Sequence, residues 1–136
     1  MSGRPVPVPD EVSAPHWSAA ADHQLTIAKC SACGAFSHPP DVVCKHCGSV
    51  TPDFQFAAID GGGVLRSWTV VRQSFLPGFE TPYLLVDVEL DAQPGLRFVA
   101  RLLDDLDVPL SIGARVEVAF EDLAESVAVP AFRLAP

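Results

Sequence analysis

Two segments decide the fold: Cys30-Ser31-Ala32-Cys33-Gly34 and Cys44-Lys45-His46-Cys47-Gly48. Each is a Cys-x-x-Cys pair followed by glycine, and ten residues separate the two pairs. Each pair predicts two thiolates on a tight turn, where backbone N–H groups can reach sulfur and glycine supplies a positive φ. Four soft thiolates in tetrahedral geometry favour zinc over magnesium or calcium. The sequence therefore predicts a zinc ribbon at residues 25–50, with a closed, structural site formed by Cys30, Cys33, Cys44 and Cys47.

Other uses of these cysteines have weaker support. Iron in a rubredoxin-like site is the minor alternative, and a thioredoxin-like dithiol needs one cysteine pair at a helix start, not two in tandem. His38 and His46 would become ligands only if a cysteine failed. The stretch MSGRPVPVPDEVSAP has no apolar core of a secretion signal, so we expect a cytoplasmic location, where thiols stay reduced.

The charge balance disfavours nucleic acid as a partner. Nine Lys and Arg residues stand against seventeen Asp and Glu residues, which gives a formal net charge of −8. Four thiolates on one divalent metal would add about two further negative charges. A nucleic-acid module usually clusters Lys and Arg, whereas here they are scattered. The apolar runs are also too short to span a membrane, which needs about 20 residues.

Residues 1–24 predict a proline-rich arm followed by a short helix. We expect the first dozen residues to be extended or disordered; the alternative is an arm that becomes ordered on a partner. Ser13 can cap a helix and Pro15 suits its first turn. Trp17 shares a helical face with Ala20, Ala21 and Gln24, and packs this helix onto the ribbon or the barrel, or contacts a partner.

Residues 51–136 alternate between apolar and polar side chains as strands do. Leu84, Val86, Val88 and Leu90 should point inward, and Gly61–Gly63 reads as a turn or barrel bend, because no phosphate-loop lysine follows. Several short strands without a long helix predict an antiparallel sheet that closes into a five-stranded OB-fold barrel. The predicted fold is mainly β: an N-terminal helix, a rubredoxin-like zinc ribbon and a C-terminal barrel. We expect strands at 54–59, 64–73, 83–90, 96–103, 115–120 and 127–134.

The order of these motifs resembles the zinc-ribbon plus OB-fold proteins catalogued as domain of unknown function 35. The resemblance runs from about residue 16 to the C-terminus. Two positions depart from the pattern: Lys45 replaces the proline common after the third cysteine, and residues 93–95 lengthen a turn. The matching segments are His16-Trp17, Leu25, Cys30-x-x-Cys33-Gly34, Pro39-Pro40, Cys44-x-x-Cys47-Gly48-Ser49, Gly61 to Val71 with Ser67-Trp68-Thr69-Val70, Val86-x-Val88-Glu89-Leu90, Ile112-Gly113-x-x-Val116-Glu117-Val118 and Phe132-Arg133-x-Ala135.

The resemblance implies a protein that works with acyl-CoA beside a thiolase-fold partner, such as a thiolase or a lipid-transfer-protein aldolase of steroid side-chain degradation. The sequence contains no Gly-x-Ser-x-Gly motif, and its cysteines are assigned to metal, so we expect a non-catalytic accessory subunit. The alternatives are an independent acyl-CoA carrier or sensor, and a single-strand-binding OB protein, which the acidic charge disfavours.

The chemistry of the side chains suggests which residues would contact CoA and the partner. Arginine pairs with phosphate and tryptophan stacks on adenine, whereas the alternative is that outward arginines pair with Asp and Glu. Apolar residues on the 75–82 loop and the helix are candidates for the interface with the partner. The candidate CoA contacts are Arg66, Trp68 and Arg72 on one strand face, with Arg97 and Arg101 on another. The candidate interface residues are Trp17, Phe75, Leu76 and Phe79.

Overall fold

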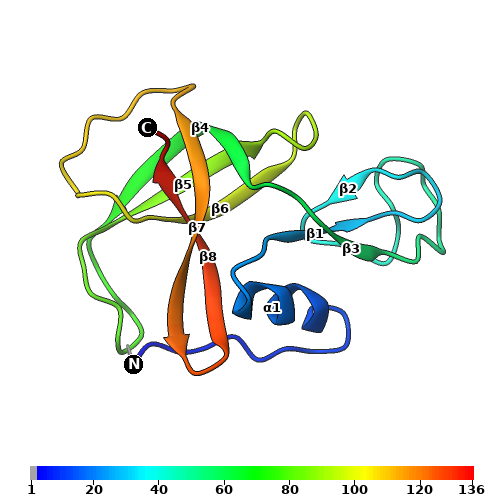
Figure 1. Ribbon diagram of the computed structural model, residues 1–136, viewed down its shortest axis with the longest axis horizontal. Helices are drawn as coiled ribbons and strands as arrows, with labels where there is room; N and C mark the ends of the chain where they lie inside the picture. Colours follow the sequence, from blue (N-terminus) through cyan, green and yellow to red (C-terminus); the bar gives the residue numbers. More distant parts are fainter. Residues whose placement is uncertain (1–2) are drawn as a thin grey trace.

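A computed structural model describes residues 3–136 of the protein. A small sheet lies at one end, a closed five-stranded barrel at the other, and a short helix beside both (Figure 1). The mainly β fold is thereby confirmed. No helix in this range is long and apolar enough to cross a membrane. The elements are α1 Ala14–Ala21, β1 Thr26–Lys29, β2 Phe36–Ser37, β3 Gln55–Ala58, β4 Gly62–Val71, β5 Tyr83–Leu90, β6 Arg97–Leu102, β7 Arg115–Ala124 and β8 Val127–Leu134.

The start of α1 differs from the expected serine cap. The side chain of Ser13 makes no cap hydrogen bond to the helix. Its hydroxyl accepts the N–H of Asp10 at 3.1 Å, and the Asp10 carboxylate accepts the N–H of Ser13 at 2.7 Å. The carbonyl of Asp10 also accepts the N–H of Ala14 at 2.9 Å. Asp10 and Ser13 therefore form a reciprocal pair one turn earlier, and Pro15 lies in the first helical turn as predicted.

The buried side of α1 also differs from the predicted face. His16 and Ala20 are buried, whereas Trp17 is half-buried and Gln24 is exposed. The helix contacts both β8 and β1, so the helix residues that face these two strands are the buried ones. The His16 ring can be buried because its Nδ1 donates to the carbonyl of Thr26 at 3.0 Å. Trp17 therefore lines the edge of this contact.

The small sheet has the order β2-β1-β3 and is antiparallel. The strand expected at 54–59 to open the barrel is β3, and it pairs instead with β1, where Ala57 lies opposite Ile27. That expectation was wrong because the chain returns beside β1 after the second cysteine pair, and the N–H of Ser31 donates to the carbonyl of Pro52 at 2.8 Å. Leu25 and Ile27 belong to the same buried cluster as the barrel residues, so the base of the ribbon and the barrel share one core.

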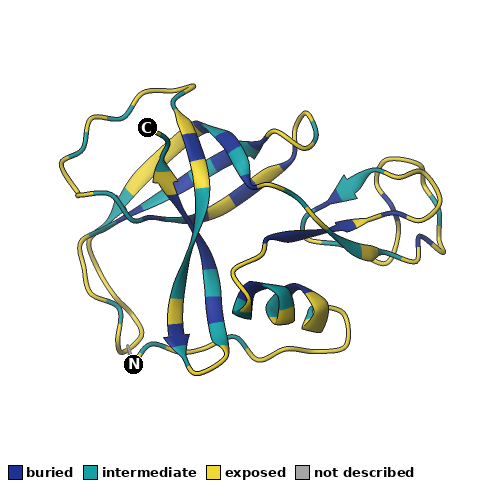
Figure 2. Ribbon diagram, in the orientation of Figure 1, coloured by how far each residue is buried: buried dark blue, intermediate teal, exposed yellow. Residues whose placement is uncertain are grey.

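The barrel has the strand order β4-β5-β6-β8-β7 and closes where β7 meets β4. Neighbouring strands are antiparallel except β6 and β8, which meet in parallel at Leu102 and Phe132. The predicted inward set on β5 is confirmed, since alternate residues are buried along the strand (Figure 2). Close approach explains the glycines at the start of β4: a Cβ at Gly63 would lie 2.6 Å from the carbonyl oxygen of Glu89.

The proline-rich arm lies on the barrel over the part that the structure describes. Residues 3–10 contain neither helix nor strand, as expected for an extended segment. The guanidinium of Arg4 lies 3.3 Å from the carboxylate of Glu121 and 5.1 Å from the centre of the Phe79 ring. The arm therefore binds its own barrel through Arg4. The expectation for residues 1 and 2 lies outside the described range.

One side-chain amide joins the ribbon to the barrel. Gln93, in the turn between β5 and β6, accepts the N–H of Phe36 at 2.8 Å and donates to its carbonyl at 2.9 Å. The Gln93 amide thus makes the two hydrogen bonds that a neighbouring strand would make at the outer edge of β2. Gln93 belongs to the lengthened turn that departs from the family pattern.

Replacing Gln93 with alanine should loosen this contact without unfolding the barrel. Two neutral hydrogen bonds are lost, and a net contribution of about 1 kcal/mol each predicts a small fall in stability. The sharper readout is amide hydrogen exchange, which should accelerate at Phe36. Gln55→Ala is the matched control, because within residues 3–136 the side-chain amide of Gln55 bonds only the exposed Asp53 carboxylate, at 3.2 Å. Equal exchange rates at Phe36 in both variants would contradict the role given to Gln93.

Candidate functional site

The two cysteine turns have the same backbone geometry. The N–H of Gly34 donates to the carbonyl of Cys30 at 2.8 Å, and the N–H of Gly48 donates to that of Cys44 at 2.8 Å. Both glycines have positive φ, +79° and +77°, as the sequence predicts. The N–H of Ala35 lies 3.5 Å from the sulfur of Cys33, within reach of a thiolate. The repeat in the sequence is therefore a repeat in structure.

The four cysteine sulfurs converge on one point. All lie within 4.8 Å of one another, and no other group of three or more potential ligands is found within residues 3–136. The sulfurs of Cys30 and Cys47 are 4.0 Å apart, and those of Cys33 and Cys44 are 3.8 Å apart. A tetrahedral zinc with sulfur ligands at about 2.3 Å requires sulfur–sulfur distances of about 3.8 Å. The donor set therefore fits a closed tetrahedral zinc site and leaves no open position for catalysis.

Backbone groups prepare this site for metal. The N–H groups of Cys47 and His46 hydrogen-bond the sulfur of Cys44 and lower the pKa of that thiol to about 7. At Cys33 the N–H of Ala35 also lowers the pKa, but burial and the three neighbouring thiols outweigh it and raise the pKa to about 11. The thiolate is the form that binds metal, so the turn at Cys44 favours the required protonation state. The His46 side chain is not part of the cluster, because its Nε2 lies 3.0 Å from the carbonyl of Phe36.

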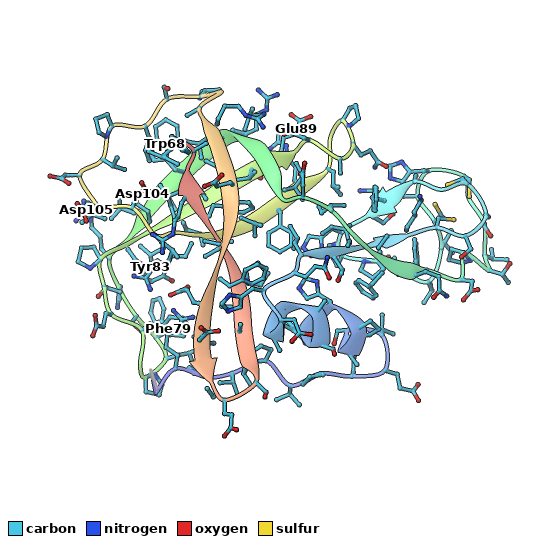
Figure 3. All side chains as sticks on the ribbon, viewed as in Figure 1. Trp68, Phe79, Tyr83, Glu89, Asp104 and Asp105 are labelled. Carbon is cyan, nitrogen blue, oxygen red and sulfur yellow. The ribbon has the colours of Figure 1, made fainter. Side chains whose placement is uncertain are left out.

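A bulge separates the residues proposed on one face of β4. The register with β5 shifts between Leu65 and Ser67, and Trp68 then lies opposite the core residue Val86. Arg66 lies on the outer face, where its guanidinium is 2.7 Å from the carboxylate of Glu89. The extra residue reverses the alternation, so Arg66 and Trp68 lie on opposite faces, contrary to expectation. Trp68 is 39% exposed and lies at the end of the barrel away from the ribbon (Figure 3).

The other arginines differ in how far they are already paired. Arg97 lies 2.6 Å from the carboxylate of Asp87, and Arg101 lies 3.1 Å from that of Glu121 and over the Tyr83 ring. Arg72 is exposed after β4 and has no ion pair within residues 3–136. The structure therefore does not gather the five predicted CoA contacts at one place. It leaves Trp68, on β4, and Arg72, directly after β4, as an exposed pair that is close in sequence.

The loop between β4 and β5 divides its apolar residues between solvent and the barrel. Phe75 is 86% exposed and Leu76 is 55% exposed. Phe79 instead packs within the chain, with its ring 6.4 Å from that of Tyr83 and beneath the guanidinium of Arg4. The predicted interface residues therefore separate into an exposed pair, Phe75 and Leu76, and residues with contacts of their own.

Sequence reasoning missed His38, which it treated only as a reserve ligand. The His38 ring stacks on Phe98 with 4.4 Å between centroids and 15° between planes. Burial, and secondarily the nearby His16, lower the pKa of His38 to about 4. Two histidines on either side of the first cysteine pair are a faint signal, since either could equally lie in solvent. Their meeting depends on how α1 and the ribbon pack against β6.

Similarity to known proteins identifies the family. Residues 17–51 match a family model described as "ChsH2, rubredoxin-like zinc ribbon domain", and residues 57–121 match "ChsH2, C-terminal OB-fold domain". A solved chain described as "Ltp2-ChsH2(DUF35) aldolase" is 30% identical, with a TM-score of 0.79 over 94% of this chain and 98% of that one. The chain belongs to the ChsH2 (DUF35) family.

Two further relatives extend the family comparison. A DUF35 protein of unknown function from Sulfolobus solfataricus has 14% identity and a TM-score of 0.57, over 92% of this chain and 86% of that one, and so shares the fold. The "Probable enoyl-CoA hydratase alpha subunit" of Thermomonospora curvata is 34% identical over 130 residues. That match includes 96% of this ChsH2-family chain but only 40% of the length of the hydratase subunit.

Removing the metal should unfold the ribbon and leave the barrel largely folded. Metal binding supplies on the order of 10 kcal/mol to small zinc modules, and the distal half of this ribbon buries little besides two cysteines. Elemental analysis should find about one zinc per chain. After chelation, NMR amide signals of residues 25–58 should lose dispersion while those of β5 and β6 persist. A metal-free ribbon with an unchanged spectrum would contradict the assignment.

Stability should fall with acidity through His38. The folded pKa of about 4 lies below the ordinary value of 6.5, so the unfolded chain takes up a proton first as the pH falls. The stability that the protein gains from keeping His38 neutral is complete above about pH 6.5 and is lost as the pH falls towards about 4. In His38→Phe, the fall in melting temperature from pH 7 to pH 5 should be smaller than in wild type. Parallel curves of melting temperature against pH for the two proteins would contradict this role of His38. Titration of the metal ligands and of the carboxylates is common to both proteins and therefore cancels in the comparison.

Proposed function

We propose that this chain is a non-catalytic accessory subunit of a thiolase-fold enzyme that acts on acyl-CoA thioesters. The partner would be a thiolase or a retro-aldolase, for example in steroid or lipid side-chain degradation. The observation that carries the proposal is the likeness, over 98% of its length, to the ChsH2-type chain of a solved aldolase. Because that chain is matched from end to end, the assembly mode of the relative is the best guide to this one.

The chemistry of the described side chains supports an accessory role. The cysteines converge on the metal site, and His23 pairs with the exposed Asp122 carboxylate at 2.7 Å. Neither His16 nor His38 hydrogen-bonds to a hydroxyl, a thiol or a carboxylate within residues 3–136. A nucleophile activated by a neighbouring base is therefore not assembled in this range. The partner would supply the groups that make or break the bond.

A direct contact with CoA is a narrower part of the same proposal. Arg66, Arg97 and Arg101 already face carboxylates, which would compete with phosphate. Trp68 and Arg72 lie four residues apart near the end of β4, and both are exposed. We therefore propose Trp68 for stacking on adenine and Arg72 for pairing with phosphate, once the partner forms the rest of the site.

A hydratase is the second candidate for the partner enzyme. It is favoured by the 34% identity to a protein named as a probable enoyl-CoA hydratase alpha subunit. Both candidates place this chain beside an enzyme of CoA thioesters. They differ in the reaction: one makes or breaks a carbon–carbon bond, and the other adds water to a double bond.

The proposal predicts that activity requires a second protein. The isolated, zinc-loaded chain should show no thiolase, aldolase, hydratase or thioesterase turnover. Co-purified with the thiolase-fold protein encoded nearest its gene, it should form a stable complex that buries at least ~1,000 Å² and raises the turnover of that protein. Turnover by the isolated chain would overturn the accessory role, and activity only with a hydratase partner would select the second candidate.

The exposed loop residues provide the matched variants. Phe75→Ser with Leu76→Ser should leave the melting temperature unchanged and weaken partner binding at least tenfold, because both side chains are exposed. Val42→Ser is the control, since Val42 is similarly exposed, at 80%, on the ribbon. Phe79→Ser should instead lower stability through its packing against Arg4 and Tyr83. Unchanged binding by the double variant would remove this loop from the interface.

A further inference from the structure

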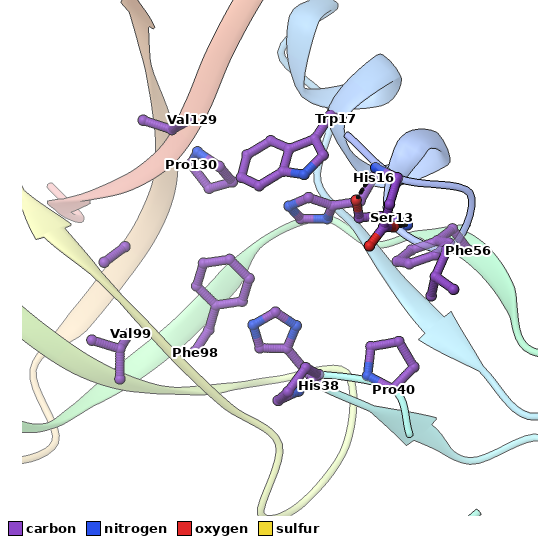
Figure 4. Close-up of a pocket in the computed structure, with 14 residues that line it drawn as sticks. Ser13, His16, Trp17, His38, Pro40, Phe56, Phe98, Val99, Val129 and Pro130 are labelled. Atoms are coloured by element: carbon purple, nitrogen blue, oxygen red, sulfur yellow. Dashed lines mark hydrogen bonds between the residues drawn. The ribbon is translucent and has the colours of Figure 1, made fainter. Parts of the chain in front are cut away.

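A cavity lies where the helix, the ribbon and the barrel meet. It has a volume of about 470 Å³, within the range of about 300–1,000 Å³ that is usual for small-molecule sites. Its walls come from α1, β3, the loop after β2, and strands β6 and β8 (Figure 4). Of the predicted site residues, only Trp17 lines it. The cavity is therefore separate from the metal site and from the arginines of the barrel.

Its walls are mainly apolar and aromatic. Trp17 and Pro130 form one side, Phe98 lies across from them, and Phe56 lies toward the ribbon (Figure 4). Val99 also borders the cavity and remains 57% exposed. Rings and an uncovered valine at a concave surface favour a ligand that can displace water from them.

Two imidazoles supply the hydrogen-bonding groups. His16 uses Nδ1 to donate to Thr26, which leaves Nε2 without a hydrogen bond within residues 3–136. His38 stacks on Phe98, and neither of its ring nitrogens has a hydrogen-bond partner in the same range. With a pKa near 4, His38 is neutral at pH 7 and offers one donor and one acceptor. A bound molecule could therefore satisfy polar atoms that the protein leaves open.

The charge of the lining limits which ligands fit. Among residues 3–136, no lysine or arginine borders the cavity, and the one ionised side chain that does is Asp10, which already accepts the N–H of Ser13 at 2.7 Å. A phosphate, sulfate or carboxylate would find no cation here and would face Asp10. A ligand with an apolar body and a single uncharged oxygen matches both the walls and the imidazoles.

We propose that this cavity binds an uncharged, mainly apolar small molecule whose one oxygen hydrogen-bonds to His38 or His16. The hydrophobic body displaces water from Trp17 and Val99, and the imidazoles fix its orientation. The proposal goes beyond the accessory role and does not depend on it, because binding is tested with the isolated chain. The variants that test partner binding and those that test ligand binding lie on different surfaces. A failure of the accessory role can therefore be distinguished from a failure of this proposal.

A matched pair of probes tests the chemistry. At pH 7, 2-naphthol should bind the full, zinc-loaded chain saturably and shift NMR signals of His38, Phe98 and Val99. Naphthalene-2-sulfonate has the same rings and a fixed negative charge, so it should bind at least tenfold more weakly. Equal affinity for the two probes, or shifts confined to other residues, would overturn the proposal.

Variants of the lining test the location. Val99→Glu places a charge at the exposed rim and should weaken 2-naphthol binding at least tenfold, whereas Ile112→Glu is the control, because Ile112 is 71% exposed and lies outside the lining. His38→Phe keeps the ring and should weaken binding about fivefold, the effect of one neutral hydrogen bond. Melting temperatures establish that each variant is folded. Wild-type affinity in folded Val99→Glu would place the probe elsewhere and overturn the assignment.

Discussion

Convergence of four thiolates on one point is the constraint on which the arrangement of this protein depends. The distal half of the ribbon has almost no core, because Cys30 and Cys44 are among its few buried side chains. The cysteine turns hold β1 and β2 together, and β1 then presents Leu25 and Ile27 to the core that the barrel shares. Metal coordination at one end therefore acts on hydrophobic packing at the other.

The parts of the fold that follow local rules could be predicted from sequence. Each cysteine turn is specified by five consecutive residues, and the alternation along β5 fixes its inward face without reference to distant segments. The destination of β3 depends on which edge is free after the second cysteine turn, and that is a long-range property. The bulge beside Arg66 is also invisible to alternation, since one extra residue reverses every later side chain of the strand.

The candidate binding residues show the same division. Chemistry alone could single out Trp68 and the arginines, but it could not show that Arg66 and Arg97 already face Glu89 and Asp87. Such exposed pairs contribute little to stability. These pairs do neutralise the arginines on an acidic surface. Apolar contacts are therefore the more effective basis for binding another molecule. The cavity beside His38 has such apolar walls, and they come from the helix, the ribbon and the barrel.

The amide of Gln93 has a consequence for self-association. β2 is an outer strand of the small sheet, and an uncovered outer strand can recruit a strand from another molecule. Gln93 occupies both backbone hydrogen-bonding groups of Phe36 on that edge. The turn that anchors the ribbon thus also occupies the two backbone groups of Phe36 that a strand from another copy of the chain would need in order to pair there.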